Sequence, residues 1–169
     1  VDSIYALHNT PDYPAGVIAV QPGPVEAAAD TFEIVVTGRG GHAAIPHEAI
    51  DPVLVASHIV IALQSIVSRN LHPLEAGVVT VASMQTSQLS ACNVIPAQVK
   101  MLGTARSFTP ANRDLLEKRI GEIAQGVAIA FGAIATCHYQ RGYPSTVNHT
   151  EQALFAAQFV QNPWYPVAE

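Results

Sequence analysis

The clearest pattern in the chain is the strict alternation of apolar and polar residues over residues 31–37. Phe32, Ile34 and Val36 fall on one face of an extended strand, and the polar residues between them fall on the other. Similar short apolar stretches between turn-forming residues predict three further strands, over residues 78–84, 97–106 and 133–141.

Two other stretches have the spacing of helices. The first begins at Asp51-Pro52, where aspartate is a good N-cap and proline suits the first helical position, and it extends to about Arg69. The second begins at Thr109-Pro110 and is expected to end at Gly132. It has one apolar stripe, and we expect its charged residues, Arg113 included, to face solvent.

The first helix is apolar on more than one side, so we expect it to be buried on two sides. One side can pack on a sheet, whereas the other is expected to meet another subunit or domain. Ile59 and Leu63 are our candidate contact residues for that interface.

The order of these elements is β-α-β-β-α-β over residues 31–141. This order is typical of a ferredoxin-like α+β domain, in which two helices cover one face of a four-stranded antiparallel sheet. We interpret residues 1–30 and 142–169 as segments of a second, incomplete domain. Within them we expect a buried strand at residues 3–7 and a helix from Thr150 to Val160. The last residues, 162–166, are expected to be irregular.

Composition narrows the classes of partner. Only 12% of the 169 residues are charged and 49% are hydrophobic, whereas about 25% charged is usual for a soluble domain. The net charge of −5 and the lack of a Lys/Arg cluster argue against nucleic acid as a partner. The longest apolar run is interrupted by His58, Gln64 and Ser65, which makes it a poor membrane span.

The cysteines and the first residues of the chain bear on the compartment of the protein and on its length. Cys92 and Cys137 lie far apart and form no CxxC motif, which suits free thiols in a reducing compartment. A single disulfide between them is the alternative. We recognise no secretory signal and expect a cytoplasmic protein. The chain starts without methionine, so we expect it to be part of a longer protein.

A glycine-rich bend, Gly38-Arg39-Gly40-Gly41-His42, joins the first strand to the first helix. Glycines allow a positive φ or the close approach of another chain or ligand, so His42 is either a packing residue or a group facing a substrate. His42 and His47 cannot share a helical face as the histidines of HExxH do, and neither a nucleophile elbow nor a phosphate loop is present. By position alone, His8 is better explained as a strand-end residue than as a metal ligand.

Five motifs, taken together and in this order, show a resemblance to a known family. The sequence resembles the metal-dependent aminoacylases, hippurate hydrolases and auxin-conjugate amidohydrolases of the carboxypeptidase G and succinyl-diaminopimelate desuccinylase superfamily. The resemblance covers nearly the whole chain, and its motifs are Ala6-Leu7-His8-Asn9, Gly40-Gly41-His42-Ala43-Ala44, Asp51-Pro52, Asn93-Val94-Ile95-Pro96 and Gly103-Thr104-Ala105-Arg106. It implies that residues 31–141 form a lid that mediates homodimerisation and is inserted into a catalytic α/β domain.

The resemblance also implies roles for individual residues. His8 matches a ligand of a site with two divalent metal ions, for which Zn²⁺, Mn²⁺ and Co²⁺ are all suitable. His42 matches a lid histidine that reaches into the partner's active site and stabilises an oxyanion. Asn93 and Arg106 match positions that hold the carbonyl or carboxylate of an N-acyl amino acid or related amide. The structural alternatives are a turn position for Asn93 and an exposed strand end for Arg106.

The remaining histidines are expected to be structural: His47, His58, His72, His138 and His149. The family's other metal ligands and its general-base glutamate have no counterpart in this sequence, so we predict that the chain alone is inactive. The rival hypothesis is an autonomous ferredoxin-like module that dimerises or binds a small molecule without catalysis.

Overall fold

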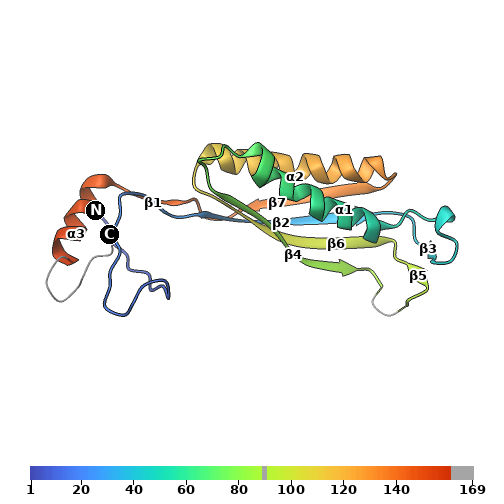
Figure 1. Ribbon diagram of the computed structural model, residues 1–169, viewed down its shortest axis with the longest axis horizontal. Coiled ribbons are helices and arrows are strands. Elements are labelled where there is room, and N and C mark those ends of the chain that lie inside the picture. The colour runs from blue at the N-terminus through green and yellow to red at the C-terminus, as the bar shows by residue number, and fades with distance from the viewer. Residues whose placement is uncertain (89–90, 161–169) are drawn as a thin grey trace. The chain divides into compact units, whose positions relative to one another are not determined.

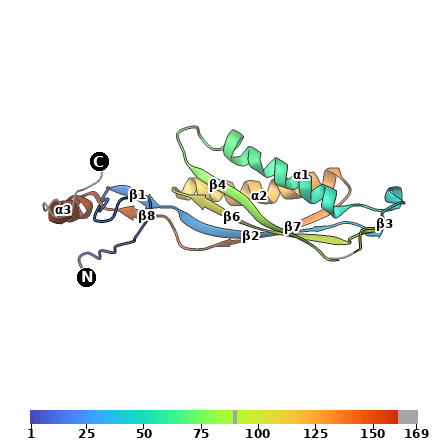
Figure 2. The ribbon, with the colours of Figure 1, turned by 60° about the horizontal axis from the view of Figure 1, so that its bottom comes forward.

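The computed structural model describes residues 1–88 and 91–160. The chain divides into two compact units. The larger is Ala27–Ser145, and the smaller combines Val1–Glu26 with the segment that starts at Thr146. Figure 1 labels most elements of both units, and Figure 2 also labels β8.

The larger unit contains a four-stranded antiparallel sheet in the order β4-β6-β2-β7. Helices α1 and α2 cover one face of this sheet (Figure 2). The arrangement confirms the predicted ferredoxin-like α+β fold. Its elements are β2 (Ala28–Thr37), α1 (Pro52–Ser65), β4 (Gly77–Thr86), β6 (Gln98–Ser107), α2 (Pro110–Ala130) and β7 (Ile134–Arg141).

The core lies between the helices and the sheet. The alternation of strand β2 directs Phe32, Ile34 and Val36 toward the helices, and all three are at most 2% exposed. Burial of each such side chain contributes about 1.5–3 kcal/mol. The helices supply the opposing layer of fully buried side chains, which includes Val55, Ile59, Leu63, Leu116 and Ile120.

Helix α1 is buried on one side only within this chain. Ile59 and Leu63 are fully buried in the core, so our expectation that they contact a partner is wrong. The apolar residues that face outward are Leu54, 50% exposed, and Ile61, 70% exposed. The helical turn places these two on the same outer stripe, because they are seven residues apart.

The helix boundaries follow from local chemistry, as predicted. The Asp51 carboxylate accepts a hydrogen bond of 2.8 Å from the backbone N–H of Val53, and Thr109 caps α2 in the same way. Each cap contributes about 1 kcal/mol. Helix α2 ends at Ala130 and is followed by Gly132, whose φ is 75°, and the N–H of Ala133 donates to the carbonyl of Ala128 at 2.8 Å. This is a Schellman ending, in which glycine avoids the strain of a left-handed conformation.

After Ser65, helix α1 continues into a π-helical segment, η2 (Ile66–Asn70). The combined helix, Pro52–Asn70, is long and apolar enough to cross a membrane by length and composition. Its inner side packs into the core, and core helices of soluble domains meet the same criterion. The helix is therefore weak evidence for a membrane span.

The described residues of the smaller unit form one strand pair and one helix. Strand β1 (Gly23–Glu26) pairs antiparallel with β8 (Thr146–Asn148), and α3 spans Thr150–Val160 as predicted. The strand predicted at residues 3–7 is wrong, because residues 1–10 are exposed and have no regular secondary structure. A strand needs a neighbour for its backbone groups, and no described residue pairs with this segment. The irregular end predicted for residues 162–166 lies outside the described residues.

The two cysteines are free thiols, so the alternative of a disulfide between them is not realised. Cys92 is exposed and precedes the short strand β5 (Val94–Ile95), whereas Cys137 is partly buried on β7. Burial raises the pKa of the Cys137 thiol, and the nearby Glu117 carboxylate raises it further. The Cys137 thiol is therefore poorly reactive at neutral pH.

Candidate functional site

The glycine-rich bend forms the tip of the sheet, which we define as residues 38–45 and 93–97. Two short strands pair there, β3 (Gly41–His42) and β5 (Val94–Ile95), with His42 opposite Val94. The N–H of Ala43 donates to the carbonyl of Asn93 at 2.9 Å. The fold thus brings His42 and Asn93 together, although sequence spacing gave no sign that these two segments pair.

The glycines of the bend are required for close approach. A side chain on Gly40 would lie 2.9 Å from the carbonyl oxygen of Ile95, and one on Gly38 would collide with the carbonyl of Ile50. Neither glycine has a positive φ, since the positive-φ glycines of the described chain lie elsewhere. The bend therefore needs glycine because backbones pass close together here.

His42 is exposed, and one of its ring nitrogens is held by the backbone. Its Nδ1 accepts a hydrogen bond of 3.1 Å from the N–H of Ala44. Because Nδ1 accepts, the proton of the neutral ring is on Nε2. No described residue forms a hydrogen bond with Nε2 of His42. The tip therefore leaves the Nε2–H of His42 available as a hydrogen-bond donor.

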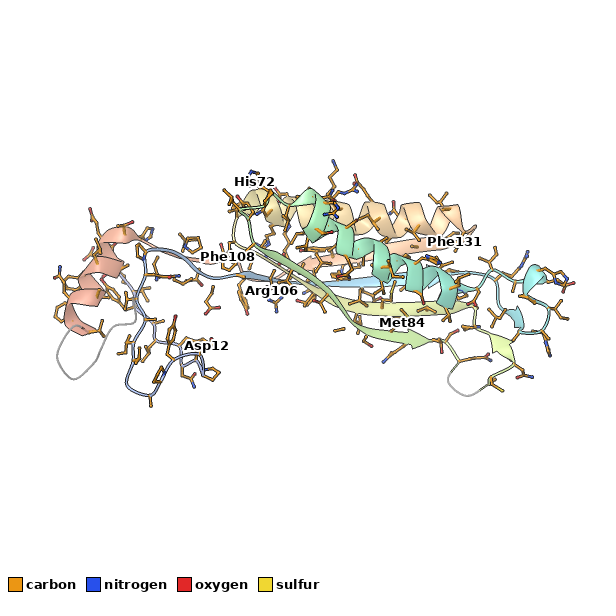
Figure 3. The ribbon with its side chains drawn as sticks, in the orientation of Figure 1. Asp12, His72, Met84, Arg106, Phe108 and Phe131 are labelled. Carbon is orange, nitrogen blue, oxygen red and sulfur yellow. The ribbon has the colours of Figure 1, made fainter. Side chains whose placement is uncertain are left out.

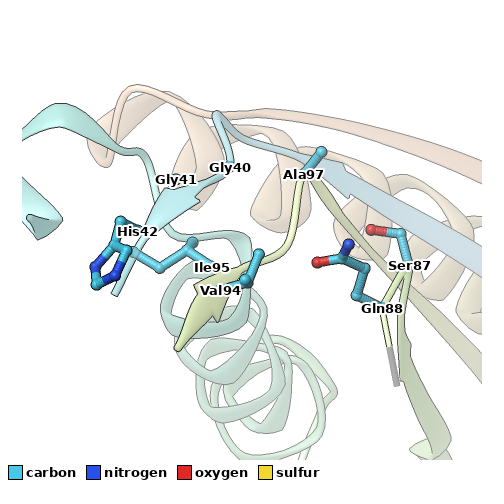
Figure 4. Close-up of a pocket in the computed structure, with 8 residues that line it drawn as sticks. All are labelled: Gly40, Gly41, His42, Ser87, Gln88, Val94, Ile95 and Ala97. Carbon is cyan, nitrogen blue, oxygen red and sulfur yellow. The ribbon is translucent and has the colours of Figure 1, made fainter. Parts of the chain in front are cut away.

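A pocket of 440 Å³ lies beside His42 (Figure 4), a volume within the usual range for small-molecule sites. Its walls are mostly apolar, with Gln88 and Ser87 as further polar groups. The N–H of Ser87 donates to the carbonyl of Gln98 at 3.1 Å, which ties this wall to β6. The lining residues are Gly40, Gly41, His42, Ser87, Gln88, Val94, Ile95 and Ala97.

Arg106 lies at the opposite end of the sheet from the tip (Figures 1 and 3). It pairs with Ala29 of β2 and Val78 of β4, whereas β6 begins beside the tip at Gln98. At about 3.3 Å per residue, the distance along β6 from Ala97 to Arg106 is about 30 Å. We call this end the root of the sheet. Arg106 and His42 of one chain cannot contact the same small molecule.

At the root, the Arg106 guanidinium is partly buried and held by oxygen atoms of the same sheet. Its Nη1 donates to the hydroxyl of Thr104, to the carbonyl of Ala105 at 3.0 Å and to the carbonyl of Asp30 at 3.4 Å. No carboxylate among the described residues pairs with Arg106. The root thus contains a fixed cation with capacity for an anion.

Asp30 is the centre of a buried polar network at the root, and the sequence analysis missed it. Its side chain is 2% exposed and accepts two hydrogen bonds from Arg113, at 2.5 and 2.9 Å. It also accepts from the Tyr139 hydroxyl at 2.8 Å and from the N–H of Gly142 at 3.0 Å. The prediction that Arg113 faces solvent is therefore wrong, because this side chain is the partner of a buried carboxylate.

The network controls the ionisation of its members. Burial by itself raises the pKa of Asp30, but the hydrogen bonds from Arg113, Tyr139 and Gly142 outweigh it and hold the pKa below its ordinary value. The pKa of Arg113 is raised, chiefly by its hydrogen bond to Asp30. Burial and the bond to Asp30 raise the pKa of Tyr139. Asp30 is therefore a carboxylate at neutral pH and Tyr139 a phenol.

His8 is exposed in the smaller unit. Its Nδ1 lies 2.6 Å from the carbonyl oxygen of Asn9, and because a carbonyl can only accept, Nδ1 carries the proton. The Nε2 lone pair is then available to a metal ion, in the arrangement usual for histidine ligands. However, no group of three or more His, Cys, Asp or Glu side chains in residues 1–88 and 91–160 could hold a metal ion. The described residues therefore do not form a metal site by themselves.

Two of the remaining histidines make contacts within the larger unit. His58 on α1 stacks on Phe131 at a ring-centre distance of 4.8 Å. His72 accepts a hydrogen bond from the N–H of Leu74 at 3.2 Å through its Nδ1. Both contacts fit the structural roles expected for these two residues.

Comparison with known proteins gives a consistent result. Residues 27–130 match the model of the peptidase dimerisation domain of the M20 family. The chain is 41% identical over 148 residues to N-acetylcysteine deacetylase of Bacillus subtilis, covering 88% of this chain and 38% of that protein. It is 39% identical over 160 residues to N-acetyldiaminopimelate deacetylase of Brevibacillus brevis, covering 95% of this chain and 42% of that protein.

A solved structure agrees with these relatives. The Bacillus subtilis protein YXEP, described as a dinuclear metal binding peptidase of the M20 family, superposes with a TM-score of 0.72 at 30% identity. The match covers 96% of this chain and 39% of that structure. The chain therefore spans about two fifths of the length of the relatives it matches. From the matched domain, the sequence identities and the shared fold together, we conclude that the chain belongs to the M20 peptidase family and contains its dimerisation domain.

Proposed function

We propose that the chain is the lid, with short flanks of the catalytic domain, of a dinuclear-metal amidohydrolase that cleaves N-acyl amino acids or related amides. The deacetylase names of its relatives support the reaction class. The observation that carries the proposal is the tip, where His42 presents a free Nε2–H beside Asn93 and a pocket of substrate size. On this proposal residues 31–141 form the lid, and residues 1–30 and 142–169 belong to the catalytic domain.

The chemistry assigned to this chain is electrostatic stabilisation. When water attacks an amide carbonyl, the oxygen becomes an oxyanion, and the Nε2–H of His42 donates a hydrogen bond to it. A donor of this kind contributes about 3–4 kcal/mol to the transition state. We assign the exposed Asn93 to the same substrate, because its backbone pairs with the segment that carries His42. The products are a carboxylic acid and an amine.

Two further groups complete the proposed site. The divalent metal ions of the family would supply an activated water, and His8 would hold one ligand position through Nε2. Arg106 would bind the substrate carboxylate, because a guanidinium forms two parallel hydrogen bonds with a carboxylate. The other metal ligands and the general base would come from parts of the protein outside this chain, so the chain alone is expected to be inactive.

The separation of tip and root supports the proposal that these groups serve different active sites. Because about 30 Å of sheet separates His42 from Arg106, a single substrate cannot use both groups of one lid. The family resemblance implies that His42 acts in the active site of the partner subunit. We assign Arg106 to the active site of its own subunit, and His42 and Asn93 to the site of the partner.

The surface available for a homodimer is the outer side of α1 together with the edge of β4. Leu54 and Ile61 project from the helix, and Met84, which pairs with the core residue Met101, is 40% exposed on β4. Strand β4 is an edge of the sheet, so one row of its backbone groups is unpaired by any described strand. An apolar stripe next to an open strand edge suits a second copy of the same surface.

The proposal is tested with mixed dimers of the full-length parent enzyme. His42→Ala and His8→Ala subunits are prepared separately, and each homodimer is expected to lose most of its hydrolysis of N-acetyl amino acids, about 10²–10³-fold for His42→Ala. A mixed dimer contains one complete site if His42 acts in the partner, because the His8→Ala subunit donates its His42 to the intact metal site.

The expected result is activity in the mixed dimer well above either homodimer. If His42 acted within its own subunit, neither site of the mixed dimer would be complete and activity would stay at the homodimer level. Near wild-type activity of the His42→Ala homodimer would refute the oxyanion role altogether. The rival, a module without catalysis, predicts no hydrolysis by the wild-type parent.

A further inference from the structure

Thr104 lies between Arg106 and the backbone of Asp30 at the root of the sheet. Its hydroxyl donates to the carbonyl of Asp30 at 2.8 Å and accepts a hydrogen bond from Nη1 of Arg106. A hydroxyl has only one proton, so the bond to Asp30 fixes the rotation of the group and turns a lone pair toward Arg106. Thr104 and Arg106 are two residues apart on β6, which places them on the same face of the strand.

The three acceptors around Arg106 all contact Nη1. No described residue accepts a hydrogen bond from its Nε or Nη2. These two nitrogens form the edge of the guanidinium that best matches the two oxygens of a carboxylate. The contacts thus hold the guanidinium through Nη1 and leave the edge formed by Nε and Nη2 without an acceptor among the described residues.

The support for this arrangement is rigid. The carbonyl of Asp30 accepts a hydrogen bond from the Thr104 hydroxyl. The carboxylate of the same residue accepts hydrogen bonds from Arg113, Tyr139 and Gly142. Asp30 is therefore fixed at both its backbone and its side chain. A hydrogen bond to a buried, fixed carbonyl keeps its geometry, whereas an exposed side chain would reorient.

We propose that Thr104 is a positioning residue, which orients the Nε–Nη2 edge of Arg106 toward the carboxylate of the substrate. The inference rests on the proposed function, in which Arg106 binds that carboxylate. Without the hydroxyl, Nη1 loses one of its three acceptors, and the long arginine side chain gains rotamers that point elsewhere. Substrate binding then weakens, while the reacting amide and the groups that act on it are unchanged.

The test measures hydrolysis by the full-length enzyme of an N-acetyl amino acid and of the same compound with a carboxamide in place of its carboxylate. The variant Thr104→Val keeps the shape and strand preference of threonine and removes the hydroxyl. We expect KM for the acid to rise about tenfold, as suits the loss of one hydrogen bond to a charged group, with kcat within about twofold. KM for the carboxamide is expected to stay the same, and Thr104→Ser is expected to restore KM for the acid.

Two controls separate this role from a structural one. Tyr139→Phe removes a donor to the Asp30 carboxylate and leaves the Asp30 carbonyl in place, so it should lower stability without changing KM for the acid. Arg106→Lys tests the carboxylate site itself. If Thr104→Val does not fold, Thr104→Ala provides the same comparison with a smaller side chain.

The outcomes separate the role of Arg106 from the role of Thr104. An unchanged KM for the acid in Arg106→Lys overturns the role of Arg106 in the proposed function. A raised KM in Arg106→Lys with wild-type values in Thr104→Val overturns only the positioning role of Thr104. An equal rise in KM for acid and carboxamide in Thr104→Val also overturns it, since a general distortion would affect both substrates.

Discussion

The buried network around Asp30 should dominate the stability of the larger unit. The change Asp30→Asn keeps the shape of the side chain, removes its charge and turns an amide toward donors. Arg113 is left without its carboxylate partner in a site where Asp30 is 2% exposed and Arg113 13% exposed. Loss of one member of a buried ion pair costs about 3–5 kcal/mol. In a unit of roughly 120 residues this corresponds to a fall in Tm of about 12–20 °C.

The pH dependence provides a second, independent measure of the same network. The pKa of Asp30 is lower in the folded than in the unfolded state. Its contribution to stability is therefore complete above the ordinary value of 3.8 and is lost as the pH falls from there through the folded pKa. Wild type and Asp30→Asn should differ most near neutral pH, and the difference should shrink steadily below about pH 4.

The assay is thermal unfolding by calorimetry, with hydrogen exchange of strands β2 and β7 to identify the unit that unfolds. The matched control is Arg141→Gln. Arg141 also joins β7 to α2, through Asp114 and Glu117, but it lies at the surface, where ion pairs contribute little. A fall in Tm of Asp30→Asn no larger than that of the control would refute the reasoning. So would a difference from wild type that persists unchanged into acid.

Two further predictions concern the interface and the core. Ile61→Asp on the outer side of α1 should shift the full-length protein from dimer to monomer in analytical ultracentrifugation and leave its circular dichroism unchanged. Ile59→Asp places a charge in the core and should instead unfold the unit. Gly103→Ala should destabilise the fold in denaturant titrations, because the added carbon would collide with the ring of Phe32. Gly121→Ala on α2, where an added carbon would have no neighbour within 4 Å, should stabilise the fold by about 0.5–1 kcal/mol. Equal effects of the two glycine changes would contradict the prediction that the space around each glycine decides the result.

The larger unit could be predicted from sequence because its signals are local. Alternation in β2, the caps at Asp51 and Thr109 and the stop at Gly132 each depend on a few neighbouring residues. The strand predicted at residues 3–7 failed for the opposite reason. An apolar run becomes a strand only if a second strand pairs with it, and no described residue does so.

The arrangement of the site could not be predicted, because it depends on contacts between distant residues. Asp30 and Arg113 are 83 positions apart, and nothing in the charge pattern of α2 distinguishes Arg113 from its exposed neighbours. Strands β3 and β5 have two residues each, too few for a periodic signal. The resemblance assigned roles to His42 and Arg106, but only the sheet register indicates that they lie at opposite ends.

The length of β6 has a consequence for how the proposed enzyme would behave in solution. If each active site takes its carboxylate anchor from one subunit and its oxyanion donor from the other, a dissociated subunit contains no complete site. Specific activity should then depend on protein concentration and fall on dilution below the dissociation constant of the dimer. Association of the subunits would then be required for catalysis.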